Sequence, residues 1–250
     1  MNYKTTLCTA ALCLAQVGLS AAAAQAETDY IYASFASPEL PDSKAIQAFL
    51  DTVNENSSNI HFDGSFGGAM GGPRELISNI STGVVSAGNI IDGYAPKQLA
   101  ANSVLRVLGT LGGDQIAVSG AVNETILLDC PRCIEDMENL DVLGLGNYAV
   151  PGYVLICRAP FDGYDQFKAL RIRSAGEFAQ VFAAVGATPV QIPFPETYEA
   201  LERGHVECSH SQQSYLRAAN FWDVAKDVYD QPPLGIYNTA QLFAVNKSVW

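Results

Sequence analysis

The sequence predicts an α/β protein built from two related lobes. Between residues 169 and 209, three strand-like runs alternate with two helical segments, the pattern of a parallel α/β unit with helical crossovers. The helix expected to end at Gly83 leads after one residue into a strand at Val85, and this arrangement recurs at Gly204 and Val206. A repeated helix–strand unit indicates two lobes of related build. The chain has 250 residues, 48% of them hydrophobic, which is enough to form a core in each lobe.

The chain is acidic, with 26 Asp and Glu residues against 14 Lys and Arg residues and a formal net charge of −12. Such a chain repels phosphate backbones, and no basic stripe interrupts the sequence, so the composition argues against nucleic-acid binding. Charged residues make up 16% of the chain and aromatic residues 10%. This composition is typical of a compact mixed globular protein rather than a disordered one.

The N-terminus has the pattern of a cleaved secretory signal. Lys4 is the only charge before Glu27, the stretch from Thr5 to Ala24 is small and apolar, and an A-x-A motif ends at Ala26. The alternative is an anchoring transmembrane helix, because about 20 uncharged residues can span a bilayer. Polar interruptions and the A-x-A motif favour cleavage. We therefore predict that residues 1–26 are removed after about Ala26 and that the mature protein is periplasmic.

Removal of the signal leaves four cysteines, and an even number in an exported protein favours disulfides. Cys130 and Cys133 form a C-x-x-C motif. Redox folds place this motif at a helix start after a strand, and the surrounding sequence fits that placement. A structural bridge is the favoured interpretation, with a redox pair as the alternative. Cys157 and Cys208 each end a strand-like run, so a second bridge follows if those strands are neighbours.

The first half of the mature chain is expected to contain three strands and two helices. Asp42 and Ser43 offer N-caps for the first helix. Pro73 suits the first position of the second helix, which Gly83 ends. The expected strands are residues 29–35, 59–66 and 84–90. The expected buried face of the first helix is Ile46, Phe49, Leu50 and Val53.

In the second half of the chain, the helix ends and strands of the parallel unit can be assigned to particular residues. Ser174 and Glu177 have the spacing of a capping box at a helix start, and Gly186 is placed to end that helix. Pro195 opens the next helix and Gly204 closes it. The expected strands are residues 169–173, 188–194 and 205–209. The expected apolar stripe of the first of these helices is Phe178, Val181, Phe182 and Val185.

Arg173 stands out as a candidate anion-binding residue. It lies at the carboxyl end of its predicted strand, where ligands bind in open α/β sheets. The helix start expected at Ser174 adds a positive dipole end, and the guanidinium fork matches a carboxylate bidentately. The alternative is a surface arginine paired with a nearby acid.

Three stretches of the sequence together carry a family resemblance. The central one is residues 169–209, "ALRIRSAG" through "PETYEALERGHVECS". The other two are "GGPRELISNISTGVVSAG" near the first helix–strand repeat and "YNTAQLFAVNKSVW" at the end of the chain. They resemble the solute receptors of tripartite ATP-independent periplasmic (TRAP) transporters, which capture organic acids. The positions that meet the family pattern are Arg173, Gly186, Ala187, Pro189, Glu196, Tyr198, Ala200, Leu201, Gly204 and Val206.

The resemblance implies a periplasmic-binding-protein-like fold with a mixed sheet in each lobe and a ligand cleft between them. Lobe I would be residues 27–150 with a return segment at 236–250, and lobe II residues 151–235. Family members close on their ligand by a hinge without chemistry, so we expect no enzymatic activity, cofactor or metal. The expected partners are a small carboxylate and the permease subunits of a TRAP transporter. Family members continue past this point with helices that brace both lobes, so we expect a C-terminally truncated member that lacks them.

The resemblance also assigns residues to the ligand site. Arg173 would be the carboxylate clamp and Phe194 the apolar wall beside it. Three residues after the second-lobe strand would line the cleft: Ser209, His210 and Ser211. The remaining candidates are aromatic or polar residues of both lobes: Tyr153, Asp92, Tyr94, Asn238 and Gln241.

Departures from the family pattern leave the bound acid open. A second family arginine would fall near Gly152 or Tyr153, where there is none, and this argues against a compact dicarboxylate. The family has Asp where Glu207 stands and often Asn at or near Ser211. Its substrates include dicarboxylates, 2-oxo acids, sugar acids and aromatic acids.

Other activities have weaker signals. A metal site at His205, Cys208 and His210 would need ligands on alternating faces of one strand, and a structural cysteine beside a cleft histidine is favoured instead. No G-x-S-x-G, G-x-G-x-x-G or P-loop motif is present. The best enzyme alternative is an exported thiol-disulfide protein that uses Cys130 and Cys133, although their acidic neighbours argue against a lowered thiol pKa.

Overall fold

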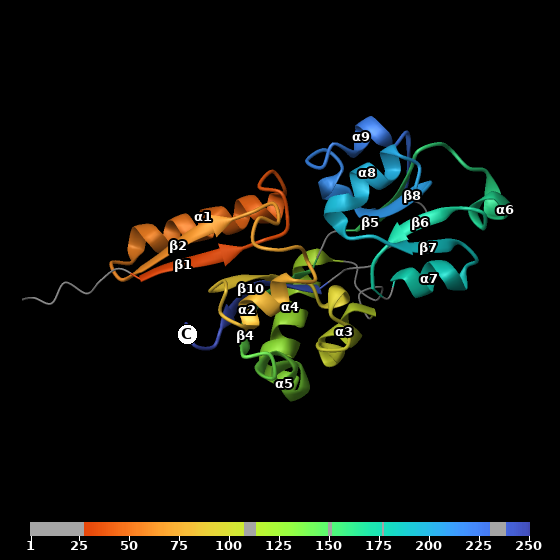
Figure 1. Cartoon of the computed structure of the whole chain (residues 1–250). Helices are drawn as coiled ribbons and strands as arrows, with labels where there is room; N and C mark the ends of the chain where they lie inside the picture. Colours follow the sequence, from red (N-terminus) through yellow and green to blue (C-terminus); the bar gives the residue numbers. More distant parts are fainter. Residues whose placement is uncertain (1–27, 108–113, 150–151, 177, 231–238) are drawn as a thin grey trace, which may run out of the picture.

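The computed structural model describes residues 28–107, 114–149, 152–176, 178–230 and 239–250, and they form two five-stranded mixed sheets (Figure 1). The first sheet has the order β2-β1-β3-β10-β4 and the second β7-β6-β8-β5-β9. In each sheet, the first three strands in this order run parallel to one another. The fourth strand pairs antiparallel with the third, and the fifth pairs antiparallel with the fourth. The prediction of two lobes of related α/β build is therefore confirmed.

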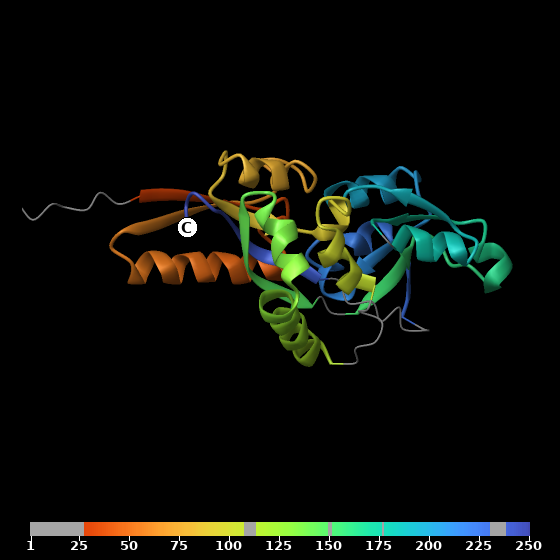
Figure 2. The ribbon, with the colours of Figure 1, turned by 90° about the horizontal axis from the view of Figure 1, so that it is seen from below.

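The first sheet and its helices come mainly from the first part of the chain, and α1 runs alongside β1 and β2 (Figure 2). Its strands are β1 (Thr28–Ala33), β2 (Ile60–Ser65), β3 (Ala87–Ile90), β4 (Val142–Ala149) and β10 (Thr239–Asn246). Its helices are α1 (Pro41–Asn56), α2 (Leu76–Ser81), the 3₁₀ turn η1 (Asp92–Tyr94), α3 (Ala100–Val107), α4 (Gln115–Glu124), the π-helical turn η3 (Thr125–Asp129) and α5 (Pro131–Glu138).

The second sheet is formed by the segment between β4 and β10. Its strands are β5 (Tyr153–Cys157), β6 (Arg171–Ser174), β7 (Thr188–Gln191), β8 (Cys208–Gln212) and β9 (Asp227–Tyr229). Its helices are α6 (Gly163–Phe167), α7 (Phe178–Ala184), the 3₁₀ turn η4 (Phe194–Glu196), α8 (Thr197–Glu202), the 3₁₀ turn η5 (Gln213–Tyr215) and α9 (Phe221–Val224). The order β7-β6-β8 with parallel pairing is the predicted parallel unit.

The chain crosses between the two sheets twice. It leaves the first sheet after β4 and enters the second at β5, then returns after β9 to form β10. Strand β10 lies between β3 and β4 and pairs antiparallel with both. Residues 239–246 therefore form an interior strand of the first sheet.

The buried faces of two helices are narrower in the structure than the sequence spacing predicts. In α1, Ile46 and Leu50 are buried, whereas Phe49 is 48% exposed. In α7, Phe178 and Phe182 are buried, whereas Val181 is 46% exposed. Each helix packs one row of side chains against its sheet, and the flanking positions stay in contact with solvent.

Helix ends are predicted better than helix starts. Gly83, Gly186 and Gly204 all have positive φ and follow α2, α7 and α8, as expected for C-terminal glycines. The starts of α1 and α2 differ from expectation, because α1 begins at Pro41 without a side-chain cap and α2 begins at Leu76.

The predicted capping box at Ser174 is wrong. Ser174 is the last residue of β6 and pairs with Gln191 of β7, while α7 begins at Phe178. Strand pairing thus extends through the position that was expected to cap the helix, and its hydroxyl has no hydrogen-bond partner within the described residues. Glu177, the other member of the motif, lies outside those residues.

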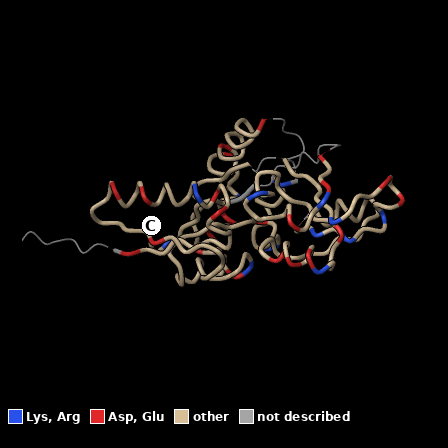
Figure 3. Tube along the Cα trace, turned by 90° about the horizontal axis from the view of Figure 1, so that it is seen from above, with Lys and Arg blue, Asp and Glu red and all other residues tan. Residues whose placement is uncertain are grey.

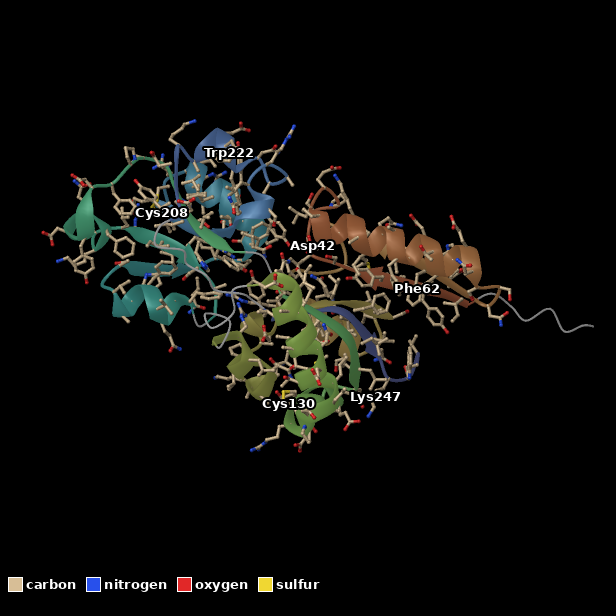
Figure 4. The ribbon with its side chains drawn as sticks, turned by 180° about the vertical axis from the view of Figure 1, so that it is seen from behind. Asp42, Phe62, Cys130, Cys208, Trp222 and Lys247 are labelled. Carbon is tan, nitrogen blue, oxygen red and sulfur yellow. A yellow bond between two sulfur atoms is a disulfide. The ribbon has the colours of Figure 1, made fainter. Side chains whose placement is uncertain are left out.

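Both predicted disulfides are present. Cys157 and Cys208 are direct cross-strand partners of β5 and β8, and they are bridged. Cys208 opens its strand rather than ending it. Cys130 and Cys133 are bridged across the start of α5 in the other lobe, and Figure 4 shows Cys130 and Cys208 far apart.

The expectation that a strand precedes the C-x-x-C motif is wrong. The residues before Cys130 form η3, which continues α4, so the motif joins two helical segments. The apolar run before the motif belongs to this helical segment, where Ile126 is buried.

Among the described residues, we find no helix with the length and apolar character that crossing a bilayer requires. Within the same residues, no group of three or more His, Cys, Asp or Glu side chains is placed to hold a metal ion. Cys208, a member of the conceivable metal site, is in a disulfide. The proposed signal segment lies outside the described residues.

Candidate functional site

A small cavity of about 50 Å³ lies between the two sheets and is lined from both sides. Elements of the first sheet contribute Tyr94 and Arg106, and elements of the second contribute Phe194 and His210. Asp42 also lines it, at the junction of the two parts of the molecule (Figure 4). Further lining residues are Phe35, Leu40, Ile91, Tyr153, Phe178, Ser211, Gln212 and Tyr215.

Arg173 is buried beside this cavity, with 5% of its surface exposed. Its Nε donates to the carbonyl oxygen of Ile192 at 2.8 Å, and its Nη1 to the carbonyl of His210 at 3.4 Å. Nη2 donates to the hydroxyl of Tyr94 at 3.3 Å. A guanidinium has five N–H donors, so one donor on each terminal nitrogen has no partner among the described residues.

The charge of Arg173 is not balanced by a carboxylate within the described part of the chain. Its neighbour Arg171, on the same strand, is about half exposed and ion-pairs with Glu207. Arg173 contacts only neutral oxygens and the face of Phe194, whose ring centroid lies 5.8 Å from the guanidinium carbon. A buried cation in such surroundings is stabilised by an anion, which makes this the chemically distinctive point of the site.

Phe194 and Tyr94, both predicted as site residues, lie together at Arg173. The Tyr94 hydroxyl accepts from the backbone N–H of Phe194 at 3.1 Å as well as from Arg173. Tyr94 comes from η1 of the first sheet and Phe194 from η4 of the second. This phenol therefore joins the two lobes beside the cavity.

The carboxylate of Asp92 is already engaged by groups of the protein. It is 5% exposed, accepts the Gly93 N–H at 2.9 Å, and forms an ion pair with Arg106 at 3.2 Å. Arg106 comes from α3 and also lies over the ring of Phe178, 5.4 Å from its centroid. The predicted residue Asp92 thus positions a second arginine that lines the cavity.

Sequence reasoning missed Arg106. The sequence shows no second arginine near Gly152 or Tyr153, whereas the structure brings one to the cavity from the helix Ala100–Val107 of the other lobe. The available signal was a single charge in an otherwise uncharged helical segment. Gly93 makes room for it, since a Cβ atom at that position would lie 1.4 Å from Nη1 of Arg106.

His210 is enclosed by aromatic rings. It stacks on Tyr153 with ring centroids 4.2 Å apart, and Phe178 and Phe182 lie at 4.6 and 5.5 Å. Burial, with a further contribution from the charges of Arg173 and Arg106, lowers the pKa of His210 to about 3. The imidazole is therefore neutral at physiological pH, and its Nε2 has no hydrogen-bond partner in the described residues.

The serines flanking His210 on β8 are also buried. The hydroxyls of Ser209 and Ser211 lie 3.1 Å apart, and Ser211 lines the cavity. Gln212 follows and donates from Nε2 to the Tyr153 hydroxyl at 3.3 Å, while its Oε1 is buried without a partner in the described residues. The structure thus brings Tyr153, Ser211 and His210 to the cavity with Gln212, which was not predicted.

Gln241, a predicted residue of the return segment, does not line this cavity. Gln241 lines a different cavity of about 170 Å³ with Cys133, Met137 and Val142. The register of β10 places it opposite Ile90 and Asn147, and its side chain packs against Gly144 on the side of α5. Asn238 lies outside the described residues.

A second cavity, of about 220 Å³, borders the first. Gly93, Tyr94 and Ala175 line both cavities, and Arg74, Gln180 and Gln191 line only the second. Tyr94 therefore stands in the wall between an inner and an outer compartment of the interlobe space.

Two lobes of mixed α/β build with a cavity between them define a two-lobed fold of the periplasmic-binding-protein type. Residues 132–250 match the family described as bacterial extracellular solute-binding protein, family 7. A solute-binding protein of Sulfitobacter sp. (strain NAS-14.1) is 24% identical over 213 residues, which are 84% of this chain and 64% of that protein. The chain spans 64% of the length of this relative.

Solved structures show the same fold. The TRAP solute-binding protein of Rhodoferax ferrireducens T118, in complex with copurified benzoate, has a TM-score of 0.78 at 18% identity and covers 88% of this chain and 69% of its own. An extracytoplasmic solute receptor of Bordetella pertussis that binds pyroglutamic acid has a TM-score of 0.71 at 15% identity and covers 88% and 71%.

Proposed function

We propose that the chain is an extracytoplasmic solute receptor that captures an organic acid in the periplasm and delivers it to the permease subunits of a TRAP transporter. The main observation behind this proposal is the burial of Arg173. Its guanidinium donates to three neutral oxygens and keeps two N–H donors without a partner in the described residues. One carboxylate binding bidentately would satisfy both donors and balance the charge. The family of residues 132–250 and the carboxylates bound by the structural neighbours support the same function.

The lobes assigned from the sequence fit this function. Lobe I is residues 27–150 with 236–250, and lobe II is residues 151–235. The interlobe cavity of about 50 Å³ is much smaller than the roughly 300 Å³ or more of typical ligand sites. Ligand entry therefore requires the lobes to separate.

The redox alternative has less support. A thiol-disulfide fold needs its C-x-x-C after a strand, and here the motif joins two helical segments with Cys133 fully buried. The family and the structural neighbours are solute receptors.

The test is a thermal-shift screen of the signal-free protein against a panel of small carboxylates. A ligand at 100 times its Kd stabilises by about 2.7 kcal/mol, which raises the midpoint by about 5–10 °C. Arg173→Ala should lower the affinity of a hit by about 2–5 kcal/mol, the cost of unpairing one partner of a buried charge pair. Arg171→Ala is the matched control, because Arg171 lies on the same strand with its exposed side chain on Glu207.

A loss of affinity below about tenfold in Arg173→Ala would overturn the clamp assignment. No stabilisation by any carboxylate, together with insulin reduction that requires Cys130 and Cys133, would favour the redox alternative.

A further inference from the structure

One cavity inside the first lobe is lined by apolar side chains and a single buried amide. It measures about 170 Å³ and lies beside Gln241, among β4, β10, η3 and α5. Its inner wall is formed by residues that are each at most 3% exposed: Ile126, Cys133, Met137 and Val142. It shares no described lining residue with the two interlobe cavities, so it is a separate compartment, and we call it the lobe I cavity.

The amide of Gln241 lacks hydrogen bonds at both of its ends. Gln241 is 5% exposed, and neither Oε1 nor Nε2 has a partner among the described residues. One donor group and one acceptor are therefore unsatisfied whichever way the amide is turned. Buried polar atoms are normally hydrogen-bonded, so this amide indicates a missing partner that presents an acceptor and a donor side by side.

The pairing of the strands fixes the amide in the cavity wall. Gln241 lies on the interior strand β10, opposite Ile90 of β3 and Asn147 of β4. Gly144 of β4 leaves room for its side chain, because a Cβ atom there would lie 2.4 Å from Oε1. A glycine inside a strand is typical of a place that another group approaches closely. The sheet thus provides both the amide and the space beside it.

The lobe I cavity opens to solvent between η3 and α5. Leu127 and Ile134 line it and are 37% and 39% exposed. Among the described lining residues, Glu138 alone carries a charge, and its carboxylate lies 3.3 Å from Nζ of Lys247 at the surface. Acidic residues also outnumber basic ones along the trace of the first lobe (Figure 3). A carboxylate in this cavity would meet no cation of the described lining, so the walls favour a neutral molecule.

The volume of the cavity sets the size of its occupant. An engineered protein cavity of about 150 Å³ with apolar walls binds benzene. A volume of about 170 Å³ therefore has room for one six-membered ring with a short substituent. The group that matches an unpaired amide is a second amide, since each then donates an N–H to the oxygen of the other.

We propose that the lobe I cavity is a second ligand site, which binds a small neutral molecule made of an apolar ring and a primary or cyclic amide. The amide of the ligand pairs with Gln241, and its ring packs against Met137 and Val142. A site that hydrogen-bonds a ligand group discriminates against analogues that lack it, because its own buried groups are then left unpaired. Since the cavity is separate from Arg173, it fills independently of a carboxylate between the lobes.

The test uses methionine methyl groups as reporters. Of the three methionines, only Met70 and Met137 lie beyond the predicted signal segment, and Met137 lines the cavity whereas Met70 does not. The mature chain, labelled with ¹³C at its methionine methyl groups, is titrated with benzamide, acetophenone and benzoate and followed by NMR. These molecules match in ring and size, but acetophenone lacks the N–H donor and benzoate is charged. A second pair of probes is 2-piperidone and cyclohexanone.

We expect the amides to shift the Met137 signal in a saturable way and to leave the Met70 signal in place. The better amide should bind at least about tenfold more tightly than its matched ketone, because the ketone leaves the donor and acceptor of Gln241 incompletely paired. Benzoate should not move the Met137 signal. Arg173→Ala should leave the amide titrations unchanged.

Gln241→Leu assigns the preference to the amide. Leucine has a similar volume and neither hydrogen-bonding atom, so the preference for the amide over its ketone should fall to less than about threefold. The variant should be at least as stable as the wild-type protein in urea unfolding, because it removes an unpaired buried amide. The matched control is Gln47→Leu, at an exposed position of α1, which should keep the full preference.

Several outcomes would overturn the inference and leave carboxylate capture at Arg173 intact. Equal affinities for the amides and their ketones, or a Met137 shift with benzoate, would contradict a site for neutral amides. An amide response that Arg173→Ala abolishes would place the molecule between the lobes, and one that Gln241→Leu retains in full would exclude the proposed pairing. If neither amide moves the Met137 signal at its solubility limit, the cavity takes up water only.

Discussion

The hydroxyl of Tyr94 lies 3.3 Å from Nη2 of Arg173 and accepts a hydrogen bond from it. The two residues belong to different lobes. The other two hydrogen bonds of the Arg173 guanidinium within the described residues go to backbone carbonyls of the second lobe. Tyr94 also accepts the Phe194 N–H, so its own proton remains to be donated. The phenol is therefore placed to join the lobes and to donate to a carboxylate that Arg173 binds.

Tyr94→Phe should weaken carboxylate binding by about threefold to tenfold, the range expected for one hydrogen bond. The phenyl ring of the variant should keep the packing contact of the native ring, which lies edge-on against Phe35 with the ring centroids 6.0 Å apart. Isothermal titration with a carboxylate that the screen identifies measures the change. The control is Tyr164→Phe, which alters an exposed tyrosine on α6. Equal or tighter binding by Tyr94→Phe would show that the phenol competes with the ligand for Arg173.

Gly93→Ala should destabilise the protein by about 3 kcal/mol. The new Cβ would occupy the position of the Arg106 guanidinium, at 1.4 Å from Nη1, and Arg106 is held there by Asp92 and by the ring of Phe178. Displacing Arg106 leaves the Asp92 carboxylate buried without its cation, a loss of about 3–5 kcal/mol for a broken buried pair. Urea unfolding, with the midpoint and slope compared between variants, measures the effect.

The matched control for this prediction is Gly120→Ala. Gly120 is an exposed residue of α4, and a Cβ atom there meets nothing within 4 Å. Alanine at this site should be neutral or stabilising by up to about 1 kcal/mol, because glycine is a poor helix former. A Gly93→Ala protein as stable as this control would mean that Arg106 is not fixed by the Asp92 pair.

Features governed by neighbouring residues could be predicted from the sequence. Gly83, Gly186 and Gly204 ended helices as expected, because a positive φ after a helix is a local requirement that glycine meets. The Cys157–Cys208 bridge was expected on the condition that two strands are neighbours, and the antiparallel pairing of β5 with β8 meets it, with Cys157 ending one strand and Cys208 opening the other.

Features governed by contacts between distant segments could not be predicted. Ser174 belongs to a strand because β7 pairs with it, and Arg106 reaches the cavity because α3 lies across from α7. Gln212 and Asp42 become candidates only when the cavity brings them together. Charged and amide side chains of this kind follow no periodic pattern in the sequence. The site residues that could be predicted are therefore those near Arg173 that the family resemblance covers.

The stability of the protein should fall in acid because of His210. Burial, then the charges of Arg173 and Arg106, lowers its pKa from 6.5 to about 3 in the folded state. Between those two pH values, the His210 imidazole is protonated in the unfolded chain and neutral in the folded protein. The contribution of this group to the free energy of unfolding is therefore fully present above about pH 6.5 and is lost as the pH falls towards 3. The expected loss from this group is about 2 kcal/mol between about pH 7.5 and pH 5.

His210→Phe isolates this contribution, since other titrating groups are common to both proteins. The aromatic neighbours Tyr153, Phe178 and Phe182 accept a phenyl ring in place of the imidazole. Urea unfolding at several pH values should show that the wild-type protein loses more stability than the variant on acidification. Parallel pH profiles for the two proteins would contradict a buried neutral histidine.

The two disulfides should contribute unequally to stability. The Cys157–Cys208 bridge closes a sequence separation of 51 residues, and the Cys130–Cys133 bridge a separation of 3. In the chain-entropy account the longer loop restricts the unfolded chain more, which gives about 4 kcal/mol for the first bridge and about 1.6 kcal/mol for the second. Cys157→Ala with Cys208→Ala should therefore lower the free energy of unfolding more than Cys130→Ala with Cys133→Ala.

Urea unfolding of the two double variants beside the wild-type protein measures this difference. Each variant removes two sulfur atoms. Cys157 and Cys208 are both fully buried, whereas Cys130 is half-buried, so the packing loss acts in the same direction as the difference in loop entropy. The Cys157–Cys208 bridge also lies beneath the site, because β8 begins at Cys208 and carries His210 two residues later. Its removal should weaken carboxylate binding as well, whereas the Cys130–Cys133 variant should bind like the wild-type protein. Equal losses of stability, or weaker binding in the Cys130–Cys133 variant alone, would contradict this assignment.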